Sequence, residues 1–136
     1  MKTKILPIFL IAFATNAIWE LLHYPLYIDL SGIPQYPHLF LATITDAIII
    51  TTIFLIISLK NSSSNWTKNP KKTDYLIALI LPIAIAIAIE TRALKIQRWA
   101  YTSSMPTILG IGLSPLIQLA TTSIITFAII KKIKST

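Results

Sequence analysis

Residues 75–94 read YLIALILPIAIAIAIETRAL, and this stretch decides the fold class. Ile and Ala alternate from Ile83 to Ile89, and a period of two is by itself typical of a β-strand. The stretch is, however, long enough to cross a bilayer as a helix, which takes about 20 apolar residues. A single open strand would leave its backbone groups unpaired in lipid. We therefore predict a transmembrane helix whose small Ala side chains permit close contact with other helices.

Three further stretches share this length and apolar character, namely residues 5–27, 38–59 and 107–130. Hydrophobic residues make up 54% of the 136-residue chain and charged residues only 12%. A soluble domain of this size could not bury so much apolar surface. The sequence therefore predicts an all-α fold, a single domain over residues 1–136 built as an integral membrane four-helix bundle.

The first stretch also has the outline of a signal peptide. Lys2 and Lys4 precede an apolar run that reaches a possible cleavage site at Ala12-Phe13-Ala14. The apolar run continues well past Ala14, so we expect the stretch to remain as the first membrane helix.

Basic residues orient the predicted bundle. If the N-terminus is cytoplasmic, nine of the twelve Lys and Arg residues fall on that side: Lys2, Lys4, Lys60, Lys68, Lys71, Lys72, Lys131, Lys132 and Lys134. The outer side receives only Arg92, Lys95 and Arg98. The positive-inside rule therefore predicts cytoplasmic N- and C-termini, with the plasma membrane as the default location. With a net charge of +7 placed between apolar segments, we expect anionic membrane lipids, and no nucleic acid, as partners.

Three of the five carboxylates, Glu20, Asp46 and Glu90, lie within or at the edge of the apolar stretches. Ionisable residues in membrane helices are costly and usually mark a functional site. At a rise of about 1.5 Å per residue, antiparallel threading brings all three to the outer half of the bilayer. We expect them to be the catalytic groups of a polar pocket that opens outward. Asp29 and Asp74 are expected in loops, where a carboxylate needs no explanation.

Polar neighbours extend this predicted pocket. Asn16, Glu20 and His23 share one helix face through their i, i+4, i+7 spacing. Ser114, Gln118 and Thr121 or Thr122 form a comparable stripe on the last helix. The residues that we expect to bind a substrate are Asn16, His23, Arg98, Trp99, Tyr101 and Gln118.

Structural roles compete with these assignments. Trp19, Tyr24, Tyr27, Trp99 and Tyr101 can serve as interfacial anchors. Glu90 can pair with Arg92 or Arg98 near the head groups. Asn16 and Gln118 can act as plain hydrogen-bonding contacts between helices.

Three functions fit the predicted pocket. Acid–base chemistry on an isoprenoid-like or other lipidic substrate is favoured, because a carboxylic acid in apolar surroundings can hold a proton and donate it. A non-enzymatic role is the alternative, as a small transporter or an accessory subunit of a larger or homo-oligomeric complex. The third is a metal-binding bundle through Glu20, His23, Asp46 and Glu90, although carboxylate-bridged metal bundles use two Glu-x-x-His motifs and this chain has one. The residues name no cofactor and leave open whether the chain is an enzyme.

The chain also resembles known proteins in Arg98-Trp99-Ala100-Tyr101, in Met105-Pro106 and in residues 109–118, LGIGLSPLIQ. With Trp19-Glu20, Pro25-Leu26-Tyr27 and Asp46, this pattern resembles a family of small four-helix bacterial membrane proteins of unassigned function. Over about twenty residues, Trp99, Tyr101, Leu109 to Ile111 and Pro115 are also similar to the lycopene cyclase domain of carotenoid biosynthesis. That similarity implies an isoprenoid substrate, but Gln118 stands where the domain has an acidic residue.

Overall fold

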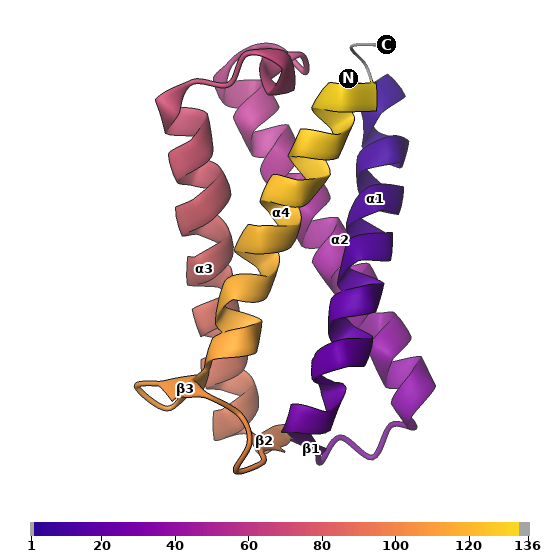
Figure 1. The fold of residues 1–136 in the computed structure, drawn as a ribbon, viewed down its shortest axis with the longest axis vertical. Helices are drawn as coiled ribbons and strands as arrows, with labels where there is room; N and C mark the ends of the chain where they lie inside the picture. The colour runs from indigo at the N-terminus through magenta and orange to yellow at the C-terminus, as the bar shows by residue number, and fades with distance from the viewer. Residues whose placement is uncertain (1, 134–136) are drawn as a thin grey trace.

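Four long helices form the bundle in the computed structural model, which describes residues 2–133 without the side chain of Lys2. They are α1 (Lys2–His23), α2 (Gln35–Lys60), α3 (Lys72–Lys95) and α4 (Leu113–Ile133). Each helix is long and apolar enough to cross a membrane. The start of α1 and the end of α4 lie at one end of the bundle, which we call the terminal end (Figure 1). Lys134, counted above among the basic residues, lies outside the described residues.

The alternating Ile–Ala stretch is helical throughout, as predicted. Ala78, Pro82, Ala86 and Ala93 are buried, and their spacing of four or seven residues puts them on one face of α3. Most of the Ile and Leu side chains between them are partly or fully exposed, as Ile87 is. The face of small residues lets α3 approach its neighbours, while Ile77, Leu81 and Ile85 pack against the core.

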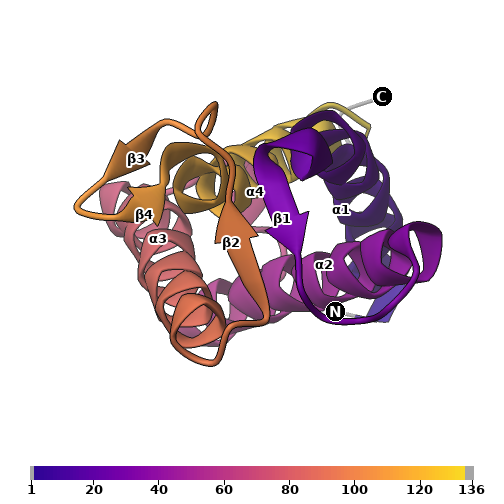
Figure 2. The same ribbon diagram turned by 90° about the horizontal axis from the view of Figure 1, so that it is seen from below.

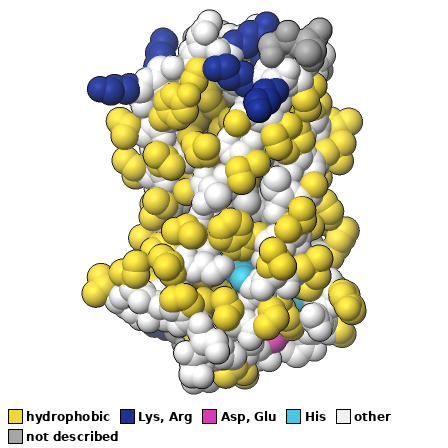
Figure 3. Space-filling model, viewed as in Figure 1, with side chains coloured by type: hydrophobic (Ala, Val, Ile, Leu, Met, Phe, Trp, Pro, Cys, Tyr) yellow, Lys and Arg dark blue, Asp and Glu magenta, His cyan; other side chains and the backbone are white. Residues whose placement is uncertain are grey.

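An apolar core fills the terminal half of the bundle. Phe54 of α2 is fully buried, and its ring centroid lies 5.8 Å from that of Trp66 and 6.3 Å from that of Phe127. Trp66 belongs to the short helix η2 (Trp66–Lys68) and donates its indole N–H to Ser58 Oγ over 3.2 Å. Hydrophobic side chains also cover the sides of the bundle, and Lys and Arg side chains crowd the terminal end (Figure 3).

Asp74 has a structural role that the sequence did not suggest. It lies in the first turn of α3 and is only 1% exposed, where we expected a loop residue. Its carboxylate accepts hydrogen bonds from Lys60 Nζ over 2.7 Å, Asn61 Nδ2 over 2.7 Å and the Lys71 backbone N–H over 2.8 Å. Asp74 therefore caps α3 and ties it to the end of α2.

Replacing Asp74 by Ala should lower the free energy of unfolding by about 3 kcal/mol, because the ammonium of Lys60 and a backbone N–H lose their acceptor. Unfolding in detergent micelles, followed by circular dichroism, would measure the change. Thr73→Ala, at the exposed neighbouring position, is the control and should stay close to the parent. An equal effect of both substitutions would contradict the capping role.

Two short β-ribbons close the opposite end of the bundle, which we call the hairpin end (Figure 2). A 3₁₀ turn, η1 (Tyr24–Leu26), follows α1 and leads into β1 (Tyr27–Asp29). β1 pairs antiparallel with β2 (Trp99–Tyr101), with Tyr27 opposite Tyr101. The second ribbon pairs β3 (Thr107–Ile108) with β4 (Ile111–Gly112). An all-α description omits these ribbons.

The predicted helix boundaries need correction at this end. α4 begins at Leu113 rather than at residue 107, because the chain turns back on itself between β3 and β4. Leu109 and Gly110 both have positive φ, 51° and 80°, at the turn between these strands. α1 ends at His23 rather than at residue 27, since Pro25 has no N–H to continue the helical hydrogen bonds.

Candidate functional site

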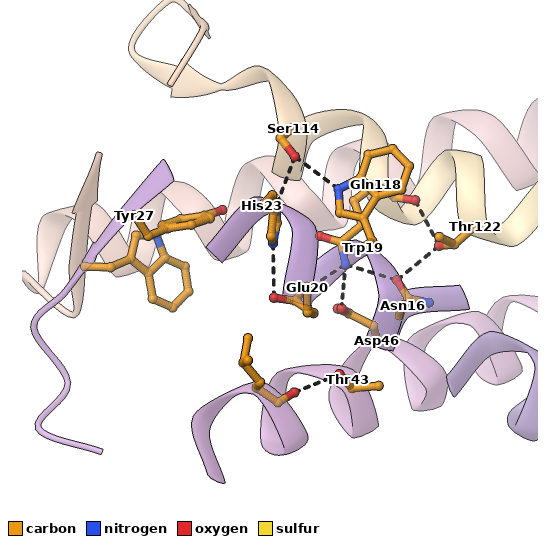
Figure 4. A network of polar contacts seen from close by, with 12 residues as sticks. Asn16, Trp19, Glu20, His23, Tyr27, Thr43, Asp46, Ser114, Gln118 and Thr122 are labelled. Atoms are coloured by element: carbon orange, nitrogen blue, oxygen red, sulfur yellow. Dashed lines mark hydrogen bonds and ion pairs between the residues drawn. The ribbon is translucent and has the colours of Figure 1, made fainter. Parts of the chain in front are cut away.

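The amide of Gln118 in α4 is the centre of a polar cluster between the helices (Figure 4). Its Nε2 donates to Glu20 Oε1 of α1 over 2.9 Å and to Asp46 Oδ2 of α2 over 2.9 Å. It also lies 3.1 Å from Asn16 Oδ1, which accepts a further hydrogen bond from Thr122. The Glu20 and Asp46 oxygens can therefore be no more than 5.8 Å apart, twice their distance from the shared nitrogen.

The hydrogens of this cluster are shared among several acceptors. An amide nitrogen carries two hydrogens, and three acceptors compete for them. Asn16 is fully buried and spends its own amide nitrogen on the Ala12 carbonyl over 2.8 Å. With Thr122 donating to Asn16, the two amide hydrogens of Gln118 are left for Glu20 and Asp46.

His23 connects the cluster to α4 at a second point. Its Nε2 lies 3.0 Å from Glu20 Oε2, and its Nδ1 lies 2.8 Å from Ser114 Oγ. The Ser114 hydroxyl oxygen also accepts the indole N–H of Trp19 over 3.0 Å. In the tautomer protonated at Nε2, Ser114 donates to His23 and His23 donates to Glu20, so that both nitrogens of the ring are paired. The i, i+4, i+7 stripe predicted on the first helix is thus drawn into one network.

Glu90 of α3 is held by aromatic side chains of the hairpin end. Its Oε2 accepts hydrogen bonds from Tyr101 Oη over 2.6 Å and Trp99 Nε1 over 3.2 Å, and Tyr27 Oη lies 3.4 Å from Oε1. Within residues 2–133, Glu90 forms no ion pair with either of the two nearby arginines. Burial, together with the hydrogen bond to Glu90, raises the pKa of Tyr101, so its hydroxyl stays protonated and donates. Glu90 therefore anchors the β1–β2 ribbon to α3.

A cavity of about 500 Å³ lies between the helices and is lined by the Glu20–Asp46 cluster and by Glu90. The three predicted carboxylates line it together with other residues expected in the site: Glu20, Asp46, Glu90, His23, Arg98, Trp99 and Gln118. Asn16 and Tyr101 lie behind this wall and support it. Much of the remaining lining is apolar, from Leu39, Leu41, Ala42, Ile89, Ala93 and Leu119. Leu41 and Thr45 of α2 and Arg92 of α3 line the cavity and are exposed, so it reaches the surface between these helices.

A third polar group at the mouth of the cavity was not expected from the sequence. Asp29 Oδ2 lies 2.6 Å from His38 Nδ1 and accepts the Tyr24 hydroxyl over 2.9 Å. Its Oδ1 accepts the Ser31 hydroxyl over 2.6 Å and the Ser31 backbone N–H over 2.9 Å. Partial burial alone would raise the pKa of Asp29, but the hydrogen bonds from Ser31 and His38 outweigh it and hold this pKa below its ordinary value. Asp29 and His38 are nine residues apart, and no helix or strand period links them.

The Glu20-x-x-His23 motif belongs to the predicted metal-binding alternative. Its two side chains bond to each other. Among residues 2–133, no three His, Asp or Glu side chains are arranged to hold a metal.

Comparison of the chain with family models, curated proteins and solved structures gives no match.

Replacing Gln118 by Leu should lower the free energy of unfolding by about 1–3 kcal/mol, because acceptors on α1 and α2 lose their shared donor. Denaturant titration in micelles would measure this loss. Ile117→Ala, at the neighbouring exposed position, serves as the control. A Gln118→Leu protein as stable as the parent would show that the cluster does not hold the helices together.

Stability should depend on pH through Asp29. Because its pKa is lowered in the fold, its contribution is complete above the unfolded-state value, about 3.9, and is lost as the pH falls through the folded-state value. Asp29→Asn should therefore be less stable than the parent at neutral pH, and the difference should shrink below about pH 4. Ser31→Ala, which keeps the carboxylate, should retain part of this pH dependence. A difference between Asp29→Asn and the parent that is constant from neutral to acid pH would contradict the assignment.

Proposed function

We propose that the bundle spans the plasma membrane with its terminal end in the cytoplasm and its hairpin end outside. The support is the distribution of charge. Lys60, Lys72, Lys131 and Lys132 lie at helix ends that meet at the terminal end, where Figure 3 shows the basic side chains crowded together. The positive-inside rule assigns such an end to the cytoplasm.

We further propose that the cavity binds an isoprenoid-like or other lipidic molecule and that Glu20 and Asp46 carry out acid–base chemistry on it. The single observation that carries this proposal is that one amide bridges both carboxyl groups in the wall of a largely apolar cavity. Like charges this close in an apolar interior oppose double ionisation. The pair therefore holds one proton, ready for donation.

The apolar lining and the position of the opening fit a lipidic substrate. A hydrocarbon substrate entering between α2 and α3 meets Leu41 and Ala42 before it reaches Asp46. The carboxyl group can protonate a carbon–carbon double bond, and the resulting carboxylate then stabilises the cation. The face of Trp99, held in place by Glu90, can stabilise the same cation. The similarity of residues 99–115 to the lycopene cyclase domain favours an isoprenoid within this class.

The hydrogen-bonded series Ser114–His23–Glu20 gives the pair a partner for regaining its proton. The same series favours proton movement as the second candidate function, either in a small transporter or in a subunit of a larger membrane complex, because buried His and Glu also serve as relays. In that case the carboxyl pair would exchange protons without changing any bound molecule.

Deuterium labelling separates the two functions. The reconstituted protein would be incubated in D₂O with membrane isoprenoid extract, and carbon-bound deuterium would be measured by mass spectrometry. Proton donation to carbon should label the product, and Glu20→Gln or Asp46→Asn should lower the labelling rate about 100-fold or more. Thr52→Val, at an exposed position of α2 that does not line the cavity, is the control. Labelling that survives both substitutions, or is never seen with the parent protein, would refute the acid–base proposal.

A further inference from the structure

The pair His38–Asp29 stands at the mouth of the cavity and has no part in the chemistry described so far. His38 lies in the first turn of α2, and Asp29 ends β1. Both side chains are only slightly exposed, 13% for His38 and 14% for Asp29, and both line the cavity. They therefore lie between the surface at the hairpin end and the Glu20–Asp46 pair.

Asp29 fixes the protonation of the imidazole ring. The low pKa of Asp29 keeps its carboxylate ionised, and an ionised carboxylate can only accept hydrogen bonds. The short contact between Asp29 Oδ2 and His38 Nδ1, 2.6 Å, therefore needs a hydrogen on Nδ1. In the neutral ring the free lone pair is then on Nε2.

The Nε2 atom of His38 is available for proton transfer. Among residues 2–133, no hydrogen bond engages it. It is not one of the fully buried unpaired side-chain atoms of this part of the chain, which are Thr67 Oγ1 and Ser123 Oγ. The ring packs with its centroid 6.4 Å from that of Trp99, which fixes its orientation on a second side.

We propose that His38, held by Asp29, passes protons between the water at the hairpin end and the Glu20–Asp46 pair. Nε2 takes a proton from water, and the Asp29 carboxylate balances the charge of the imidazolium. The same proton then leaves Nε2 for cavity water and reaches the ionised carboxyl group of the pair. A cavity of about 500 Å³ has room for the several waters that this path needs. The inference rests on the proposed function, because it assumes that the carboxyl pair exchanges a proton.

The charges around the path come from every element that lines the cavity. Asp29 and Tyr24 contact each other beside His38. The other titratable or charged groups facing the cavity are Glu20, His23, Tyr27, Asp46, Glu90, Arg92 and Arg98. Of the carboxylates in the described part of the chain, Asp29 is the one that bonds to His38.

The competing interpretation is that His38 only ties the start of α2 to β1. Kinetics distinguish the two roles. The protein in nanodiscs would be given a rapid pH jump, and the infrared band of the protonated carboxyl pair, assigned with Glu20→Gln and Asp46→Asn, would be followed in time. His38→Ala should slow the response about 100-fold, the lower range for a positioned proton-transfer group, and leave its final amplitude unchanged. Added imidazole should restore the rate in His38→Ala and leave the parent unaffected.

Two further variants keep the test decisive. His38→Gln can still donate an amide hydrogen to Asp29 but has no proton to pass on, so it should be as slow as His38→Ala even if the Ala variant folds poorly. Tyr36→Ala, exposed in the same turn and outside the network, should respond at the parent rate. An unchanged rate in His38→Gln, or a slow rate in His38→Ala that imidazole does not restore, would overturn the role of His38 and leave the shared proton of the carboxyl pair standing. A parent protein whose carboxyl band never responds would overturn the shared proton and, with it, this inference.

Discussion

The buried amide of Gln118 is the interaction on which the structure of the site depends. Polar groups inside an apolar bundle need hydrogen-bond partners, since lipid and apolar side chains cannot compensate for the free energy that an unpaired group costs. Gln118 meets this need for α1 and α2 at once, because it lies within hydrogen-bonding distance of Asn16, Glu20 and Asp46. The same atom that joins the helices therefore also fixes the spacing of the two carboxyl groups.

The helices were predictable because their signal is local. Each apolar stretch is long enough by itself, and the Ile–Ala stretch is helical although its period suggested a strand. The convergence of Glu20 and Asp46 was also predictable, since antiparallel threading and the rise of a helix set their depth. The β3–β4 ribbon was not, because Thr107–Gly112 is as apolar as the helix that follows, and only the positive φ at Leu109 and Gly110 separates them.

The Asp29–His38 pair and the cap at Asp74 were missed for a common reason. Both depend on a turn that brings separate backbone segments together, and the spacing of residues along the sequence does not reveal such a contact. For Glu90 the position was predictable from the sequence, but the hydrogen-bond partners were not. Its place in the cavity wall agrees with the depth argument, but its three aromatic donors come from two strands that the sequence did not indicate.

The opening of the cavity between α2 and α3, beside Leu41 and Thr45, has a consequence for how any occupant is supplied. In a bilayer, a ligand would arrive by lateral diffusion, so occupancy would follow its mole fraction among the lipids rather than its solubility in water. Detergent tails have the same access to the opening as lipid tails. The solubilising detergent would then compete with the ligand for the cavity. Each apparent affinity would depend on how the ligand partitions into that detergent.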